Sequence, residues 1–191
     1  RGSGSPMVRP GDDDHETFRR AGSAGDVAKA AGLEQVPIWR KVLEHPAYDQ
    51  FWQEQALDRV MARQPLAVPT MWLQGLWDQE DMWGGITSYL AVEPKDTGND
   101  RNYLVMGPWR HSQVNADGSS LGPLTFDGDT ALQFRRDVLK PFFDQYLKTG
   151  APKAATPPVL IFNTGENRWD RLDRWPLSCA WPGRVPVMQC S

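Results

Sequence analysis

Val-Pro-Thr-Met-Trp-Leu-Gln-Gly-Leu-Trp-Asp-Gln-Glu-Asp, residues 68–81, is the stretch that decides the fold class of this 191-residue chain. Its first half continues an apolar run from Leu66 to Leu73, which predicts a strand covered on both faces, as in a parallel sheet. Its second half carries the carboxylates of Asp78, Glu80 and Asp81 just beyond that strand. Because ligands bind at the carboxyl ends of strands in open α/β sheets, these acids are candidates for a functional site.

A second segment repeats this order of an apolar run followed by polar residues. Tyr103–Met106 predicts the next strand, and Gly-Pro-Trp-Arg-His-Ser (107–112) places His111 just beyond it. The segment Trp83–Val92 predicts a helix between the two strands. A strand–helix–strand connection of this length joins parallel strands and is almost always right-handed. We therefore predict the fold class α/β, with Asp78 and His111 at the ends of neighbouring parallel strands.

The part of the chain before these strands reads as helical. Residues 1–11 are rich in Gly, Ser and Pro, a composition typical of disorder. From 12 to 63 the pattern predicts short amphipathic helices, including one opened by Pro37 and one started by Asp49. Such helices are typical of a lid or cap rather than of a central core.

The part after His111 predicts one long helix and then a strand. Thr130 and Gln133 have the spacing of a capping box, Pro141 should kink the helix, and Gly150 should end it. Val159–Asn163 predicts a strand that no helix follows. This order indicates the beginning of an all-β domain.

The composition of the chain excludes several classes of protein and partner. The net charge of −3 and a pI near 5.6 give no reason to expect nucleic acid or an acidic membrane surface as partner. No run reaches the roughly 18 apolar residues that span a bilayer, and residues 1–10 lack the apolar core of a signal peptide. Cys179 and Cys190 could form a disulfide or remain two thiols, and both interpretations stay open. The mean hydropathy of −0.55 fits a chain whose buried partners lie elsewhere. A sheet that lacks most of its strands exposes an unpaired edge and apolar faces, so we expect aggregation or partial order.

An acid and a histidine at adjacent strand ends indicate acid–base chemistry. A catalytic histidine needs an acid that fixes its tautomer and stabilises the imidazolium. Asp78 lies closest to its strand and is the best candidate to orient His111. The residues alone leave another interpretation open, in which Asp78 caps the helix ahead of Trp83 and His111 is a loop residue without a task.

Other polar residues give weaker signals. We expect His15 and His45 to be structural, and no Cys/His spacing resembles a zinc site. Asp127-Gly128-Asp129 is too short for a calcium loop, and no glycine-rich phosphate loop is present. We therefore predict no metal and no cofactor.

Three segments resemble the α-amino acid ester hydrolases, which belong with cocaine esterase and the X-prolyl dipeptidyl peptidases among the serine hydrolases. They are residues 68–81, Leu-Val-Met-Gly-Pro-Trp-Arg-His-Ser (104–112) and His-Pro-Ala-Tyr-Asp-Gln-Phe-Trp (45–52). The resemblance extends over roughly residues 12–175 and implies an α/β-hydrolase domain with an inserted helical cap and a following jelly roll. It assigns 12–63 to the cap, 64–150 to the last third of the hydrolase domain and 156–191 to the start of the jelly roll.

The resemblance also implies roles for the site residues. It makes Asp78 the triad acid and His111 the triad base, and it makes Glu80 and Asp81 part of a carboxylate cluster that binds the substrate's α-ammonium group. Two crowded carboxylates repel each other, and an ammonium guest relieves that repulsion. The alternative is that Glu80 and Asp81 are acids of the kind favoured in the first turn of a helix.

The resemblance further implies a reaction and a setting. An acyl-enzyme forms from an α-amino acid ester or amide, and water or a β-lactam amine takes the acyl group. It implies a homo-oligomer and a periplasmic or secreted location, while the charge and the apolar runs of the chain lead us to expect no nucleic-acid and no membrane partner.

The nucleophile departs from the family's pattern. Its Gly-x-Ser-x-Gly turn should come between a strand and a helix and before the acid. The only match, 118–122 with Ser120 at its centre, follows the histidine and has no strand before it. Ser23 and Ser112 are no better candidates. We expect the nucleophile and the oxyanion donors to precede Arg1, and the chain alone to be inactive.

Three other interpretations remain. The substrate could be that of a glutaryl-cephalosporin acylase or of an X-prolyl dipeptidyl peptidase, although Glu80 and Asp81 would repel a glutaryl group. The tail tryptophans of this tryptophan-rich chain could form a non-catalytic carbohydrate-binding module in 156–191, although core packing is the more frequent use of tryptophan. The chain could also be a truncated reading frame with no activity.

Overall fold

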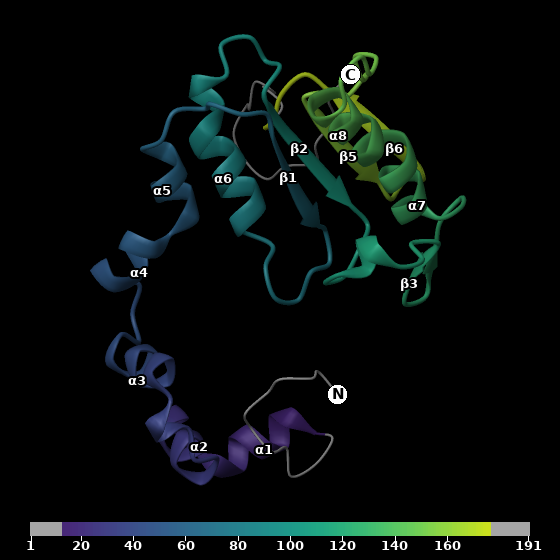
Figure 1. The fold of residues 1–191 in the computed structure, drawn as a ribbon. Coiled ribbons are helices and arrows are strands. Elements are labelled where there is room, and N and C mark those ends of the chain that lie inside the picture. The colour runs from purple at the N-terminus through teal and green to yellow at the C-terminus, as the bar shows by residue number, and fades with distance from the viewer. Residues whose placement is uncertain (1–12, 177–191) are drawn as a thin grey trace, which may run out of the picture. The chain divides into compact units, whose positions relative to one another are not determined.

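The computed structural model describes residues 13–176 and divides the chain into two compact units, one up to Ala56 and one from Leu57 onward. The first unit is coloured purple and blue in Figure 1, and the second runs from blue at α5 to yellow. All four candidate site residues belong to the second unit.

The regular elements in the described part of the first unit are all helices. Asp13 caps the first helix by accepting a hydrogen bond from the Glu16 amide at 2.9 Å, and Ser23 and Asp26 form a capping box on the second. Pro37 and Asp49 begin helices, as the sequence predicts. The elements are α1 (Asp14–Ala21), α2 (Ala24–Ala30), η1 (Leu33–Gln35), α3 (Pro37–Glu44) and α4 (Gln50–Gln55).

The second unit is built on a four-stranded sheet with the order β1-β2-β5-β6. The first three strands are parallel and the last is antiparallel to its neighbour, so the predicted α/β class and the parallel crossover are confirmed. The strands are β1 (Thr70–Gly75), β2 (Asn102–Gly107), β5 (Val159–Asn163) and β6 (Arg168–Leu172). The first strand begins after Pro69, later than the predicted run from Leu66, and continues to Gly75.

Helices and short elements connect the strands of this unit. The crossover between β1 and β2 is α6 (Gly84–Val92), which is followed by η2 (Glu93–Lys95). After β2 come η3 (Gln113–Asn115) and a small hairpin of β3 (Ser120–Leu121) and β4 (Leu124–Thr125). The unit begins with α5 (Leu57–Ala62), which packs on α6.

The strand at 159–163 corrects one prediction. Instead of opening a separate jelly roll, β5 lies parallel to β2, with Val159 opposite Leu104, and β6 returns beside it as a hairpin. Val159, Leu160 and Phe162 are buried in this position, which gives the apolar run its place in the α/β sheet. The rest of the predicted jelly roll, with Cys179 and Cys190, lies outside the described residues.

The long helix after the hairpin has three parts, α7 (Thr130–Phe134), the π-helical turn η4 (Arg135–Leu139) and α8 (Lys140–Leu147). Its cap is Asp129, whose carboxylate accepts from the Leu132 amide at 2.9 Å, and not the predicted pair of Thr130 and Gln133. The π turn ends two residues before Pro141, where a kink is predicted. Proline cannot donate a backbone hydrogen bond, and a π turn is one way in which a helix accommodates that loss.

Helices cover both faces of the sheet and hold its central strands in place. Every residue of β2 is buried. One face packs Val105 and Leu160 against Phe134 and Val138 of the long helix, and the other packs Leu104 against Tyr89 of α6. Figure 1 shows α6 and the α7–α8 helix flanking the sheet, with the β1 and β2 arrowheads pointing to the same end.

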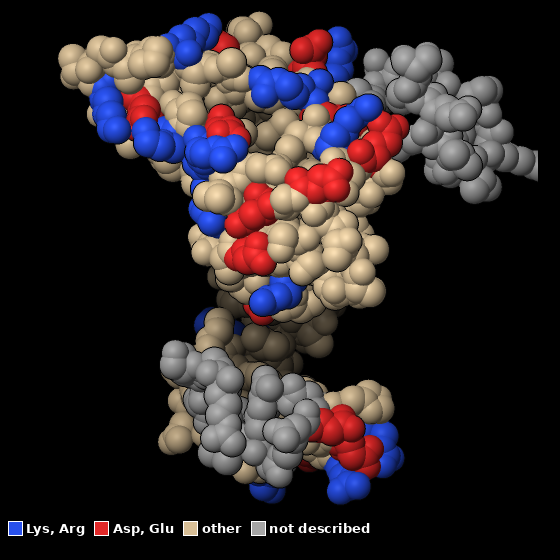
Figure 2. All heavy atoms as spheres, turned by 90° about the vertical axis from the view of Figure 1, so that its right-hand side faces the viewer, with Lys and Arg blue, Asp and Glu red and all other residues tan. Residues whose placement is uncertain are grey.

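The surface on the α7–α8 side is charged with both signs. Figure 2 shows Lys and Arg interspersed with Asp and Glu on this side. Several of these charges form ion pairs, such as Arg136 with Asp137 and Lys148 with Asp144. Within residues 13–176, no helix is both long enough and apolar enough to cross a membrane.

Candidate active site

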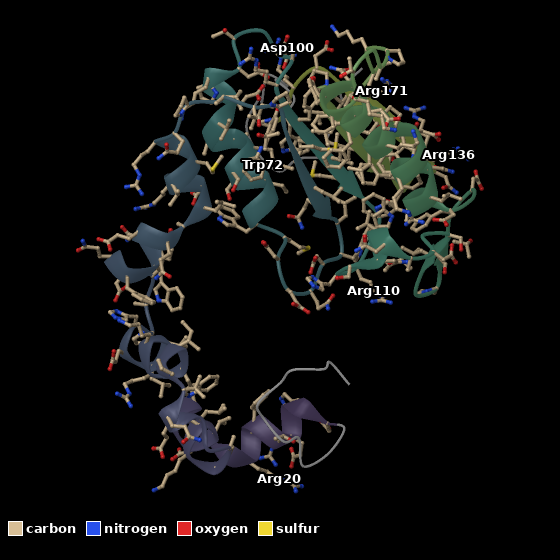
Figure 3. All side chains as sticks on the ribbon, viewed as in Figure 1. Arg20, Trp72, Asp100, Arg110, Arg136 and Arg171 are labelled. Carbon is tan, nitrogen blue, oxygen red and sulfur yellow. The ribbon has the colours of Figure 1, made fainter. Side chains whose placement is uncertain are left out.

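Asp78 and His111 meet where β1 and β2 end. The Nδ1 atom of His111 lies 3.1 Å from Oδ2 of Asp78, within hydrogen-bond distance. Both residues follow strands whose last residues, Gly75 and Gly107, are paired in the sheet register. Figure 3 labels Arg110, the neighbour of His111, just beyond the arrowheads of these strands. The structure thus places the two residues in the arrangement that a catalytic acid–histidine pair requires.

The carboxylate of Asp78 is held by its own loop. Its Oδ1 atom accepts hydrogen bonds from the backbone amides of Glu80 at 2.9 Å and Asp81 at 3.3 Å, which leaves Oδ2 for His111. The hydrogen bond from the Glu80 amide is the largest cause that holds the pKa of Asp78 below its usual value, against a smaller opposing effect of desolvation. Asp78 is therefore ionised at neutral pH, and its contribution to stability is lost only as the pH falls through this lowered pKa.

The imidazole of His111 has an acid at each nitrogen. Nδ1 faces Asp78, and Nε2 lies 3.8 Å from Oε2 of Glu80, while 46% of the side chain is exposed. Of these two acids, only Asp78 is within hydrogen-bond distance of the ring, which favours the tautomer with its proton on Nδ1, so Nε2 is the nitrogen that can accept a proton from a nucleophile.

Two glycines allow the loops to approach each other. The amides of Leu76 and Trp77 donate to the carbonyls of Gly107 and Trp109 at 2.9 and 3.1 Å. A Cβ on Gly75 would lie 2.6 Å from the Trp109 carbonyl oxygen, and one on Gly107 would lie 2.3 Å from the Trp109 ring. Only glycine fits at these strand ends, and this close contact sets the distance between Asp78 and His111.

Glu80 and Asp81 lie in the same loop but differ in their surroundings. Asp81 accepts at Oδ1 from the amides of Trp83 and Gly84, so it caps α6, the role that one interpretation gave to Asp78. Buried Gln74 donates to the Asp81 carbonyl and fixes this end of the loop. The Glu80 side chain is 61% exposed and pairs with His111. Glu80 is thus the more available of the two carboxylates for a ligand.

No serine in the described residues bonds to His111, whose partners there are Asp78 and Glu80. Ser120 lies on the β3–β4 hairpin, and its carbonyl accepts from Gln113. His45 pairs with Asp49 at 2.7 Å in the helical unit. Between residues 13 and 176, no group of three or more His, Cys, Asp or Glu side chains could hold a metal ion.

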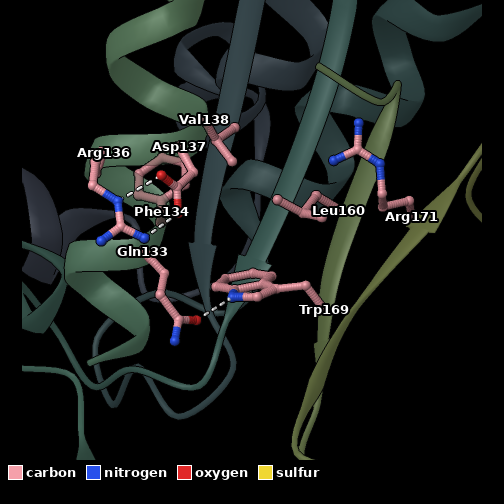
Figure 4. Close-up of a pocket in the computed structure, with 8 residues that line it drawn as sticks. All are labelled: Gln133, Phe134, Arg136, Asp137, Val138, Leu160, Trp169 and Arg171. Carbon is pink, nitrogen blue, oxygen red and sulfur yellow. Dashed lines mark hydrogen bonds and ion pairs between the residues drawn. The ribbon is translucent and has the colours of Figure 1, made fainter. Parts of the chain in front are cut away.

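A cavity of about 300 Å³ opens elsewhere, between the long helix and the β5–β6 hairpin. Figure 4 shows Arg136 and Asp137 on its helix side, facing Trp169 and Arg171 of the hairpin. None of the four predicted site residues lines it. The Asp78–His111 pair lies instead on an exposed rim of the unit.

Sequence reasoning did not identify several buried residues that support the site. Gln74 and Gln113 are buried and hydrogen-bond to the loops that carry Asp78 and His111, and the buried indole of Trp109 donates to the Thr130 hydroxyl on the long helix. Trp109 lies in the quoted Gly-Pro-Trp-Arg-His-Ser stretch, which is the only signal that could have drawn attention to it. The two glutamines show their function only once the fold is known.

Comparison with protein families matches residues 3–113 to the X-Pro dipeptidyl-peptidase (S15) family. This chain belongs to the S15 family. A comparison with curated protein sequences found no match.

Two solved structures are similar to the S15 chain. A selenomethionine-labelled α-amino acid ester hydrolase is 73% identical to it, with a TM-score of 0.86 over 91% of this chain. An aminopeptidase from a marine sediment archaeon (Thaumarchaeota archaeon) is 45% identical, with a TM-score of 0.84 over 88% of it. The chain spans 28% of the length of each of these proteins. The predicted resemblance is confirmed.

Proposed function

We propose that these residues supply the acid–base pair and part of the substrate site of a serine hydrolase that cleaves esters or amides of α-amino acids. The observation that carries this proposal is the 3.1 Å contact between Nδ1 of His111 and Asp78 at the ends of two parallel strands. The likeness to an α-amino acid ester hydrolase and to an aminopeptidase supports the substrate class, because both names concern bonds of amino-acid substrates.

His111 is the general base and then the general acid of the proposed reaction. A serine from a segment outside these 191 residues gives its proton to Nε2 as its oxygen attacks the substrate carbonyl carbon. The leaving alcohol or amine takes that proton, and an acyl-enzyme remains. Water, or the amine of a β-lactam nucleus, then attacks the acyl carbon with the same help from His111. Asp78 stabilises the imidazolium at each stage.

Glu80 and Asp81 are the proposed contacts of the substrate's α-ammonium group. The loop that holds them also holds Asp78, so a bound ammonium would place the adjacent carbonyl near Nε2 of His111. An ionised carboxylate forms charge-assisted hydrogen bonds with an ammonium and repels an anionic acyl group. These charges favour an α-amino substrate over a glutaryl one.

The family description favours one second candidate, release of X-prolyl dipeptides. Such a substrate also carries a free α-amino group, but one residue further from the cleaved carbonyl. Turnover of an X-prolyl anilide by the full-length protein at a rate above that of the matching amino acid ester would favour this candidate.

The substrate proposal predicts a selective effect of Glu80→Gln. In the full-length protein, we expect the KM for an α-amino acid ester to rise about tenfold, since a neutral amide loses the charge-assisted contact with the ammonium group. The KM for the same ester without its amino group should change by less than about twofold, because the two esters differ only in that contact. Steady-state kinetics on both esters measures the difference.

The matched control is Glu166→Gln. Glu166 is similarly exposed and pairs with Arg168 on the β5–β6 hairpin, so this variant should leave both KM values unchanged. An equal rise of KM for both esters in Glu80→Gln would contradict the ammonium-binding role.

A further inference from the structure

The loop that carries His111 has little regular structure of its own. It leaves β2 at Gly107, and Ser112 adopts a left-handed conformation with φ of 60° before the short η3 turn. The His111 side chain is half exposed, so surrounding packing does not fix it. The position of the imidazole therefore depends on the hydrogen bonds that hold the loop backbone.

Gln113 provides hydrogen bonds on both sides of this loop. Its Oε1 atom accepts from the Arg110 amide at 3.2 Å, and its Nε2 atom donates to the carbonyls of Asp117 and Ser120 at 3.1 and 2.7 Å. The residue is only 8% exposed. A buried amide whose acceptor and both donors are satisfied is a rigid bridge, because breaking any of its bonds leaves a polar group without a partner. The bridge runs from the neighbour of His111 to the β3–β4 hairpin.

The far end of the bridge is itself anchored to the long helix. Gly118 donates its amide to Asp129 at 2.8 Å, and its carbonyl accepts from the Thr130 hydroxyl at 2.7 Å. The Thr130 hydroxyl in turn accepts from the Trp109 indole at 2.9 Å. A Cβ on Gly118 would lie 2.6 Å from the Ala131 amide nitrogen, which shows how closely the hairpin lies on the helix.

Arg135 holds the other side of the same loop. From the π turn of the long helix, its Nη1 atom donates to the carbonyls of Val114 and Ala116, the latter at 3.0 Å. The π turn thus brings a guanidinium to the segment that follows His111. The residues on both sides of His111 are therefore tied to the long helix.

We infer that Gln113 is a positioning residue for His111, with Arg135 as a second clamp on the same loop. This inference rests on the proposed function. It adds the hydrogen bonds that keep His111 within hydrogen-bond distance of Asp78. Without the amide bridge, the Arg110 amide loses its acceptor and only the Arg110 carbonyl stays bonded, to the Gln113 amide, so the imidazole samples positions away from Oδ2 of Asp78.

Gln113→Met tests the inference, because methionine keeps the length of the side chain and removes its hydrogen bonds. In the full-length protein, we expect kcat to fall about 10- to 100-fold with KM within about twofold, since misplacing a catalytic group by about 1 Å has this cost. Hydrogen–deuterium exchange of the Arg110 amide should rise at least about tenfold, with the amides of β2 unchanged. Gln133→Met is the matched control, because Gln133 bonds to Trp169 and Asp127 away from the loop.

The outcomes separate positioning from a general structural role. An equal fall in both variants, a rise of KM as large as the fall of kcat, or faster exchange throughout β2 would overturn the inference. If Gln113→Met does not fold, Arg135→Met repeats the test from the helix side and should give the same pattern. If the wild-type protein hydrolyses no α-amino ester, the proposed function fails, and the exchange of the Arg110 amide alone decides whether Gln113 orders the loop.

Discussion

His111→Ala should lower kcat for an α-amino acid ester by a factor on the order of 10⁵ to 10⁶ in the full-length protein. Alanine removes the nitrogen that takes the nucleophile's proton, and the described residues place no other histidine beside Asp78. The side chain is half exposed, so its removal leaves no buried cavity and the fold should persist. Burst-phase and steady-state kinetics, with circular dichroism to verify folding, measure the effect.

His45→Ala is the matched control for this variant. His45 also pairs with an aspartate, at 2.7 Å from Asp49, but it belongs to the helical unit. Its replacement should leave kcat within about twofold, because an ion pair of this kind on the surface contributes at most a small stabilisation. Retention of more than about 1% of the wild-type kcat by His111→Ala would contradict the assignment of the base.

Asp78→Asn has the second largest expected effect, a fall in kcat of about 10⁴-fold. An amide can donate to Nδ1 of His111, which favours the tautomer whose proton is on Nε2, and that nitrogen then cannot accept a proton. The asparagine carbonyl oxygen still accepts from the amides of Glu80 and Asp81, so the loop should keep its shape. Kinetics together with the thermal midpoint of unfolding test both parts of this prediction.

Asp49→Asn is the corresponding control, because Asp49 likewise pairs with a histidine and accepts from a backbone amide. We expect it to change stability slightly and kcat by less than about twofold. A fall of less than tenfold in Asp78→Asn, with the fold intact, would show that His111 does not depend on this acid.

The sequence contains the signals for the central crossover and for the pair at its end. The apolar runs before Asp78 and His111 mark two buried strands, and parallel strands joined by one helix end at the same edge of the sheet. Local chemistry likewise predicts the helix starts at Pro37 and Asp49. These features depend on residues close together in the chain, which is why pattern alone finds them.

Features that depend on distant partners could not be predicted in this way. The run at 159–163 reads as a strand, but nothing local shows that it pairs with β2. Thr130 has the spacing of a helix cap, yet Trp109 and Gly118 engage its hydroxyl, and Asp129 caps the helix instead. Gln113 likewise acquires its role only when the hairpin folds back onto the loop of His111.

The central claim, that Asp78 acts on the reaction through His111, is tested most directly by kcat of the double variant Asp78→Asn/His111→Ala. Residues that work as one unit are strongly non-additive, so removing the second costs little once the first is gone. We predict that kcat of the double variant equals that of His111→Ala within about threefold. A further fall of about 10⁴-fold, as independent effects would give, would contradict the claim.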